Sequence, residues 1–231
     1  MLDLTADEVL TTTRAVRKRL DLARPVPRSV VEECIAIALQ APNGSNLNTW
    51  RWIAVDERAR IERMAQIYNA GLDDFVASLG SATGANYAGA EIPGFEKIDG
   101  SVQYLRDHIA QVPMLLVPVF AGRTERASTF FQASLWGSIV QAVWSFMLAL
   151  RARGLGSCWT TGHLHREREM AELLGIPADH FTQVGLFPVA YTVGTKFARA
   201  WRRPVADVLC WDRYSGAGSP ARRANTPPRR R

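Results

Sequence analysis

The sequence predicts an α+β fold in which helices flank a single sheet. Helical segments with an apolar face alternate along the chain with short apolar runs, such as the strand-like PMLLVPVF at 113–120. One run of 21 residues, 130–150, carries no formal charge and predicts a long central helix. Hydrophobic residues make up 47% and charged residues 22% of the 231 residues, which is enough for a sizeable core.

The individual elements are predicted from apolar periodicity and from the residues that start and stop helices. Helices are expected over 5–14, 27–40, 58–68, 101–111, 130–150 and 166–174. Strands are expected over 50–55, 113–120, 157–161 and 182–189, with Pro118 at a position that needs no N–H donor. The segment 71–100 is rich in Gly and small residues with scattered aromatics, and it is predicted to be a mobile excursion.

The uncharged run 130–150 has two interpretations. Its length would let it cross a membrane. Polar residues interrupt it, however, and Arg151, Arg153 and Gly154 follow it as a helix end. We therefore favour a helix that is buried on nearly all sides, at the centre of a domain or of a dimer, and we expect no association with a membrane.

The net charge of +6 comes almost entirely from the C-terminal tail. Residues 215–231 contain five Arg and no acidic residue, so subtracting five from +6 leaves +1 for residues 1–214. The Gly, Ser, Pro and Arg content of the tail predicts disorder, and 1–214 is expected to form one domain. A nearly neutral body argues against nucleic-acid binding, which the tail alone could support.

The cysteines and histidines do not form a metal-binding pattern. Cys34, Cys158 and Cys210 lie far apart, which fits neither a disulfide framework nor a paired-thiolate site. His163 and His165 form an H-x-H pair without a third ligand, so we expect a polar loop and no metal. The first residues lack a basic start followed by an apolar run, and together these features predict a cytoplasmic location.

Four polar or basic clusters could carry a function. They are TRAVRKR at 13–19, APNGSNLNTW at 41–50, RGLGSCWTTG at 153–162 and RAWRRP at 199–204. Each alone has an ordinary structural interpretation as a solvated helix end, a turn-rich loop, a helix-to-strand turn or a charged surface. The functional alternative for the basic clusters is a phosphate clamp, because the planar guanidinium offers two parallel donors to a phosphate.

In this order and spacing, the four clusters resemble the FMN-dependent nitroreductase family. The stretches GIPADHF at 175–181 and VGLFPVAY at 184–191 add to the resemblance, which covers roughly residues 5–214. It implies an α+β sandwich, a homodimer interlocked through the long helix, and two FMN molecules at the dimer interface. It also implies that NADPH or NADH donates a hydride to flavin N5, and that the flavin reduces a nitroaromatic, a quinone or a similar acceptor in a ping-pong cycle.

The resemblance assigns cations to the two ends of the cofactor. Arg14 and Arg202, from the two separated basic clusters, match positions that hold the FMN phosphate. Arg17 matches the basic residue near the flavin N1–O2 edge, where a cation stabilises the negative charge of the reduced ring. No side chain is implied as a catalytic nucleophile, because the cofactor carries the chemistry.

The resemblance also assigns two segments that contact the flavin ring. A loop that lines the ring or ribityl chain, in part from the partner subunit, matches Asn43, Gly44 and Asn46. Backbone N–H groups that face flavin N5 and O4 match Thr160, Thr161 and Gly162.

Aromatic residues near the expected ring site are candidates for substrate contact. Phe130 and Phe131 open the long helix, where the family approaches the substrate side of the flavin. Tyr104, together with Tyr87 and Phe95, lies in or near the Gly-rich excursion. These three are lid candidates because a planar acceptor stacks on aromatic rings.

The sequence therefore predicts a cytoplasmic, homodimeric, FMN-containing oxidoreductase that uses NAD(P)H and acts on small, planar, electron-poor organic molecules. Three alternatives remain open. The first is a specialised relative, such as a reductive dehalogenase, a flavin-destroying enzyme or a heterocycle oxidase. The second is a non-enzymatic flavin-binding protein, and the third is a nucleic-acid binder that uses the Arg-rich tail.

Overall fold

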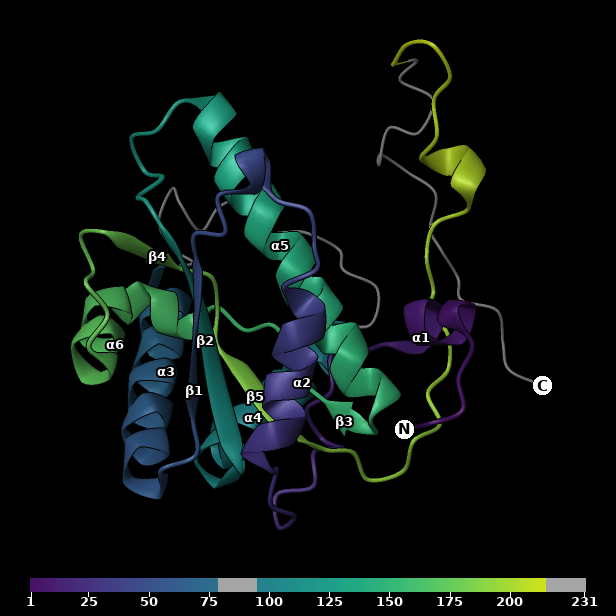
Figure 1. Cartoon of the computed structure of the whole chain (residues 1–231). Coiled ribbons are helices and arrows are strands. Elements are labelled where there is room, and N and C mark those ends of the chain that lie inside the picture. Colours follow the sequence, from purple (N-terminus) through teal and green to yellow (C-terminus); the bar gives the residue numbers. More distant parts are fainter. Residues whose placement is uncertain (79–94, 215–231) are drawn as a thin grey trace.

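A five-stranded antiparallel sheet lies between two layers of helices (Figure 1). The computed structural model describes residues 1–78 and 95–214, and the side chains of 1–78 and 100–214. Its strands are β1 (Trp50–Val55), β2 (Met114–Ala121), β3 (Leu155–Gly156), β4 (Phe181–Gln183) and β5 (Phe187–Tyr191). Its helices are α1 (Ala6–Thr12), α2 (Arg28–Ala38), α3 (Arg58–Ser78), α4 (Phe95–His108), α5 (Thr129–Ala152) and α6 (Glu167–Leu174). The strand order is β1-β2-β5-β3, with β4 paired to β2.

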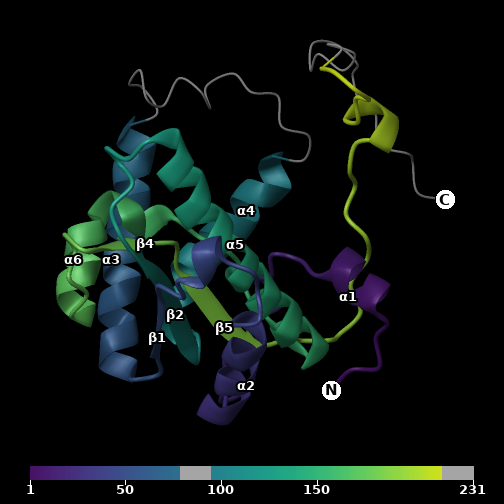
Figure 2. The ribbon, with the colours of Figure 1, turned by 45° about the horizontal axis from the view of Figure 1, so that its top comes forward.

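The central strand β2 divides the core into two halves. Alternate side chains of a strand point to opposite faces of a sheet. Leu115, Val117 and Val119 accordingly pack in one buried cluster with α3 and α6, whereas Leu116 and Phe120 pack in a second cluster with α2 and α5. Figure 2 shows these two helix pairs on opposite sides of the sheet. The arrangement confirms the predicted fold class.

The turn that follows α1 carries the first basic cluster out of the helix. A capping box starts α1, in which the Thr5 hydroxyl accepts from the N–H of Glu8 and the Glu8 carboxylate accepts from the N–H of Thr5. The helix ends at Thr12, because Thr13 adopts extended backbone with φ −66° and ψ 132°. The predicted helix over 5–14 is therefore two residues too long, and Arg14 lies in the turn.

A β-bulge splits the predicted strand 182–189 into β4 and β5. Val119 pairs with Gln183 and Leu116 pairs with Phe187, so two residues of β2 between these pairs face three residues, 184–186, of the opposite strand. Pro118 lies at this point and has no N–H to donate, although its carbonyl accepts from the N–H of Val184 at 3.0 Å. The extra residue frees the following segment to pair elsewhere.

The predicted strand 157–161 forms only two isolated bridges after the two-residue β3. Ser157 pairs with Ala15 and Thr160 pairs with Leu186, the residue that the bulge releases from β2. The prediction of one regular strand is wrong because the segment exchanges partners twice within four residues. This irregular path leaves the residues after Thr160 outside any ladder.

The predicted excursion at 71–100 is partly helical. α3 continues to Ser78, ten residues beyond its predicted end, and α4 begins at 95. Residues 79–94 lie outside the described part of the chain, as do Tyr87 and the side chain of Phe95. Within the described residues, both ends of the predicted excursion are therefore helical, as the last part of α3 and as α4.

Burial of α5 is confined to its C-terminal half. Ile139, Val143 and Phe146 have no exposed surface, whereas Phe130 and Phe131 are 73% and 58% exposed. The prediction of burial on nearly all sides is thus wrong for the first half of the helix in a single chain. Within the described residues, α5 alone has the length and hydropathy of a membrane span, and core helices of soluble proteins pass the same test.

Candidate functional site

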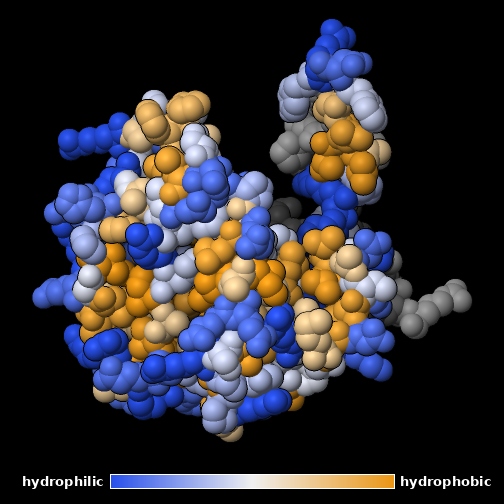
Figure 3. Space-filling model, viewed as in Figure 1, coloured by the Kyte–Doolittle hydropathy of each residue, from blue (hydrophilic) through white to orange (hydrophobic). Residues whose placement is uncertain are grey.

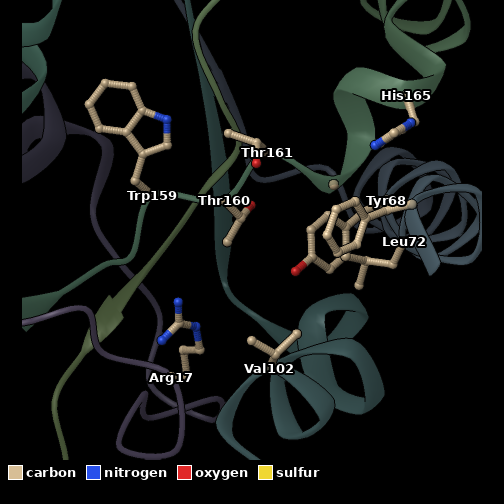
Figure 4. Close-up of a pocket in the computed structure, with 10 residues that line it drawn as sticks. Arg17, Tyr68, Leu72, Val102, Trp159, Thr160, Thr161 and His165 are labelled. Atoms are coloured by element: carbon tan, nitrogen blue, oxygen red, sulfur yellow. The ribbon is translucent and has the colours of Figure 1, made fainter. Parts of the chain in front are cut away.

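The first candidate site is a cavity of about 470 Å³ bounded by α3, α4, the turn after α1 and the segment after β3. It is lined by Arg17, Tyr68, Leu72, Phe75, Val102, Trp159, Thr160, Thr161, Gly162 and His165. Figure 4 shows side chains from the turn after α1, from α3, from α4 and from the segment after β3 around one central space. Four of the predicted cofactor residues, Arg17, Thr160, Thr161 and Gly162, therefore share one cavity.

The bulge in the sheet positions the Thr160 wall of this cavity. The N–H of Thr160 donates to the Leu186 carbonyl at 3.1 Å, and the N–H of Leu186 donates to the Thr160 carbonyl at 2.8 Å. The Thr160 hydroxyl also donates to the Leu186 carbonyl, at 2.7 Å. Thr161 and Gly162 then begin a short 3-10 helix, whose first N–H groups have no partner within the helix. They are available as donors to a ligand.

Close packing of two glycines brings α3 against this wall. A Cβ on Gly71 would lie 2.1 Å from the Gly162 carbonyl oxygen, and a Cβ on Gly162 would lie 2.8 Å from Leu72. The first distance is to backbone, so the approach requires glycine at position 71, whereas a Cβ at position 162 would force the Leu72 side chain to shift. This contact places Tyr68 and Leu72 of α3 in the cavity.

Arg17 supplies the fixed charge of the first cavity. Its Nη1 donates to the Ser101 hydroxyl at 3.3 Å, and its buried Nε has no hydrogen-bond partner among the described residues. Burial raises the pKa of the nearby Cys158 thiol to about 12 and the pKa of the Tyr68 phenol to about 12. Both groups stay neutral at physiological pH, so the cavity presents a cation to the electron-rich edge of a ligand.

A second cavity, of about 330 Å³, collects arginines from both ends of the sequence. It is lined by Leu10, Thr11, Arg14, Arg199, Ala200 and Arg202. Arg14 donates to the Thr11 carbonyl at 3.0 Å and to the Ala198 carbonyl at 2.6 Å, which fixes its guanidinium beside the C-terminal segment. Burial, and next the charge of Arg202, lower the pKa of Arg14. No acidic residue is among the described residues that line this cavity, so an anion is the complementary ligand.

The two cavities are joined by one turn of backbone. Arg14 and Arg17 lie three residues apart, and the N–H of Val16 between them donates to the Ser157 carbonyl at 2.9 Å. The turn from Arg14 to Arg17 thus contributes one arginine to each cavity. The structure brings together the predicted residues from three of the four clusters.

The predicted loop residues Asn43, Gly44 and Asn46 lie apart from both cavities. The N–H of Gly44 donates to the Ser138 hydroxyl at 2.9 Å, which holds the loop on α5. Three residues of this loop have left-handed backbone: Ser45, Asn46 and Asn48, with φ of 53°, 54° and 51°. Such strained conformations are concentrated at functional sites. Within one chain, however, the loop contributes nothing to either cavity.

The predicted substrate residues also lie outside both linings. Phe130 and Phe131 contact each other edge to face at 5.4 Å between ring centroids, on the exposed start of α5. Tyr104 on α4 stacks on His108 at 4.1 Å. Val102 of the same helix reaches the first cavity instead. The assignment of these three aromatics to substrate therefore stays a prediction.

Several residues of the site were missed by sequence reasoning. Leu72 and Phe75 enter because α3 extends past its predicted end, Tyr68 lies at that predicted end, and Gly71, which permits the close approach, has no distinctive pattern around it. In the sequence, Arg151 is distinguished only as one of the residues that end the long helix. It is 5% exposed in the structure and adjoins Arg14 in a small hollow between the helices.

His163 is buried directly behind the first cavity. It has no exposed surface, and neither ring nitrogen has a hydrogen-bond partner among the described residues. Burial lowers the pKa of His163 to about 4 from its usual 6.5. The imidazole is therefore neutral at pH 7, which makes it a core histidine and not a charged loop residue. Within residues 1–78 and 95–214, no group of three or more His, Cys, Asp or Glu side chains is placed to hold a metal ion.

The depressed pKa of His163 predicts a specific dependence of stability on pH. The unfolded chain takes up a proton near pH 6.5, whereas the folded chain resists protonation down to about pH 4. Stability is therefore lost as pH falls through this window, by about 2 kcal/mol between pH 7.5 and 5. We expect urea unfolding to show this loss in the wild type and not in His163→Gln. The same substitution at the exposed His180 is the control, and equal loss in all three proteins would contradict the assignment.

The chain matches the family model for the Nitroreductase family over residues 10–191. This match covers most of its length, and the chain belongs to that family. It is 27% identical to 5,6-dimethylbenzimidazole synthase of Rhodospirillum rubrum over 141 residues. These residues cover 59% of this chain and 60% of that protein. The chain therefore spans about three fifths of the curated relative that it matches.

Solved structures with the same fold have different activities in their names. An iodotyrosine deiodinase bound to FMN and 3-iodo-L-tyrosine superposes with a TM-score of 0.67 at 19% identity, over 91% of this chain and 100% of that one. The FMN and NADPH-dependent nitroreductase NfnB from Sphigopyxis sp. strain HMH gives 0.65 at 19% identity, with the same coverage. A BluB-like flavoprotein from Clostridium difficile 630 gives 0.66 at 16% identity, again over 91% and 100%. At these identities the likeness shows the fold, and the fold is compatible with more than one reaction.

Proposed function

We propose that the chain binds FMN and transfers electrons from NADPH or NADH to a small, planar, electron-poor acceptor such as a nitroaromatic or a quinone. One observation carries the proposal: a carboxylate-free arginine cavity and a partly apolar cavity with one cation are joined by the turn from Arg14 to Arg17. The arginine cavity fits a phosphate monoester, and the cavity with Arg17 fits a planar ring with an electron-rich edge. Membership of the Nitroreductase family and the FMN-dependent structural relatives support the same cofactor.

The residues of the chain would bind and orient the cofactor in this proposal. Arg14 and Arg202 would hold the phosphate, and the N–H groups of Thr161 and Gly162 would donate to the N5–O4 edge of the ring. Arg17 would face the opposite edge and stabilise negative charge there. When bound, FMN accepts a hydride from the nicotinamide and passes electrons to the acceptor. No catalytic side chain is needed, because the cofactor would carry the chemistry. Tyr68 and Cys158 retain their protons at physiological pH.

The proposal includes a homodimer in which a second copy completes the ring site. Phe130, Phe131, Val140 and Trp144 form an exposed apolar stripe on α5. Apolar side chains also gather over α2 and along the C-terminal arm, residues 198–214, which projects from the body (Figure 3). Contiguous apolar surface of this kind is characteristic of a protein interface. The loop held on α5 by Ser138 adjoins this surface, so a partner could present Asn43 and Asn46 to the cofactor.

Other reactions of the same fold remain as second candidates. The likeness to an iodotyrosine deiodinase favours a reductive dehalogenase, and the match to 5,6-dimethylbenzimidazole synthase favours an enzyme that consumes the flavin. A heterocycle oxidase and a flavin-binding protein without turnover complete the set. A cytoplasmic location and a single domain over 1–214 stay part of the proposal, whereas the tail predicted at 215–231 lies outside the described residues.

Steady-state kinetics with both nicotinamides separates these candidates. The purified protein, reconstituted with FMN, is expected to oxidise NADPH or NADH when a nitroaromatic or a quinone is present, with parallel double-reciprocal plots. Iodide release from iodotyrosine would favour the dehalogenase. Loss of flavin absorbance under oxygen would favour the flavin-consuming enzyme. A flavin-loaded protein that oxidises neither nicotinamide would support storage and contradict the main proposal.

Arg17→Met is expected to lower the reduction potential of bound FMN. The substitution keeps the length of the side chain and removes the cation that faces the electron-rich edge of the ring. A loss of about 1.4 kcal/mol of charge stabilisation corresponds to a shift of about 30 mV to more negative potential in a two-electron couple. Dye-coupled potentiometry measures the shift, with Lys18→Met as the neighbouring control. An unchanged potential would show that Arg17 does not contact the ring edge.

A further inference from the structure

The C-terminal end of α5 carries a buried arginine that the proposed function does not yet use. Arg151 is 5% exposed, and its buried Nε has no hydrogen-bond partner among the described residues. Its Nη1 donates to the Thr195 carbonyl at 2.9 Å, and its Nη2 donates to the Thr12 hydroxyl at 3.1 Å. In the described part of the chain it makes no ion pair. A buried guanidinium without a carboxylate is unfavourable unless other interactions compensate.

The neighbouring Arg153 shows the ordinary alternative. It lies two residues further along, and its Nε is 3.2 Å from a carboxylate oxygen of Glu33. Arg151 has mainly like charges around it: after burial, the charges of Arg19 and Arg14 are the main causes that lower its pKa, and Glu8 opposes them. The two arginines on one helix end therefore differ in partner and surroundings.

The contacts of Arg151 tie together the two segments that lead into the arginine cavity, although Thr12 and Thr195 do not themselves line it. Thr12 closes α1, directly before the turn that carries Arg14. Thr195 precedes by three residues the Ala198 carbonyl that accepts from Arg14. Arg151 therefore connects, through one side chain, the segment that leads to Arg14 and the segment that leads to Arg202.

An aromatic ring between two arginines reinforces this junction. The guanidinium carbon of Arg19 lies 4.1 Å from the centroid of the Phe197 ring, and that of Arg151 lies 4.9 Å from it. Arg19 also donates to the carbonyls of Val193, Gly194 and Lys196 at 2.7–2.9 Å. The C-terminal segment is thus fixed to the basic turn before it enters the cavity.

We propose that Arg151 is a positioning residue for the phosphate cavity, which it assembles by holding Thr12 and Thr195 while adding a positive charge beside Arg14. The inference rests on the proposed binding of FMN. It predicts that Arg151 matters for the phosphate and not for the ring, because Arg151 adjoins Arg14 and does not line the first cavity. A residue with a purely structural role would affect FMN and riboflavin alike.

The test compares the affinity for FMN with that for riboflavin, which lacks the phosphate. Flavin fluorescence titrations are made with the full-length wild type and with Arg151→Met, Arg151→Lys and the control Arg153→Met. We expect Arg151→Met to weaken FMN binding about tenfold, the effect of one lost charge-assisted interaction, and riboflavin binding less than about twofold. Arg151→Lys is expected to recover most of the loss, and Arg153→Met to resemble the wild type.

Several results would overturn the proposal. Equal weakening of FMN and riboflavin by Arg151→Met would assign a general structural role, and unchanged FMN affinity would assign none. If Arg151→Met does not fold, Thr12→Val decides, because it removes the contact of Arg151 with the Thr12 hydroxyl, together with that hydroxyl's bond to the Glu8 carbonyl, and leaves the charge in place. A loss of about threefold, confined to FMN, is then expected, and equal affinity for FMN in Thr12→Val and wild type would contradict the inference. Failure of the wild type to prefer FMN over riboflavin would instead contradict the proposed function itself.

Discussion

Replacing Arg14 and Arg202 together by Ala is expected to weaken FMN binding by about 3 kcal/mol or more, which is about a hundredfold or more in the dissociation constant. Each substitution would remove one charge-assisted contact between a guanidinium and the phosphate, and such contacts contribute about 1.5–3 kcal/mol each. The two residues lie 188 positions apart in the numbering of the chain and line one cavity. Fluorescence titration with FMN measures the loss.

The control for this double variant is its affinity for riboflavin. Riboflavin lacks the phosphate, so its affinity should change less than about twofold if the isoalloxazine cavity remains intact. The single variant Arg153→Ala removes a cation from the end of α5, where it pairs with Glu33. It should bind FMN as the wild type does. Wild-type affinity for FMN in Arg14→Ala/Arg202→Ala would show that the phosphate lies elsewhere.

Replacing Val140 and Trp144 by Glu is expected to give a monomer that no longer retains FMN. Both side chains are exposed on α5, at 38% and 40%, on the stripe that the proposal assigns to a second copy. In a two-fold interface each substitution occurs twice, so four carboxylates would be buried without partners, at a cost of several kcal/mol. Sedimentation velocity and the flavin absorbance of the sedimenting species measure both effects.

The matched control for the interface is Val76→Glu. Val76 is 61% exposed on α3, on the opposite side of the sheet from α5, and the substitution introduces the same charge. This variant should remain dimeric and yellow. A wild type that is monomeric at micromolar concentration and still binds FMN would remove the need for a partner, and a dimeric Val140→Glu/Trp144→Glu variant would place the interface on another surface.

The sequence predicted the fold where local pattern and tertiary structure agree. Strand 50–55 and the position of the long helix follow from apolar periodicity, which needs no long-range information. The split of 182–189 into two strands could not be predicted in this way. It depends on the pairing of Pro118 with a strand 66 residues later and on the exchange of hydrogen bonds between Leu186 and Thr160. Such pairings are decided by tertiary structure.

The candidate site was predicted through family resemblance more than through local pattern. Basic clusters alone are compatible with a solvated helix end. In the structure the arginines of the first cluster have three different surroundings: Arg14 lines the arginine cavity, Arg17 lines the first cavity, and Arg19 packs on the Phe197 ring. Arg151 had no signature, because a helix that ends in arginine is common and burial is not visible in sequence. Its lack of an acidic partner became informative only in three dimensions.

A crystal structure of the protein reconstituted with FMN would test the proposed binding mode directly. We expect the phosphate within hydrogen-bond distance of the guanidinium groups of Arg14 and Arg202, and the isoalloxazine ring between Arg17 and the Thr160–Gly162 backbone. A phosphate bound at any other place, with these arginines directed into solvent and the ring outside the first cavity, would contradict it.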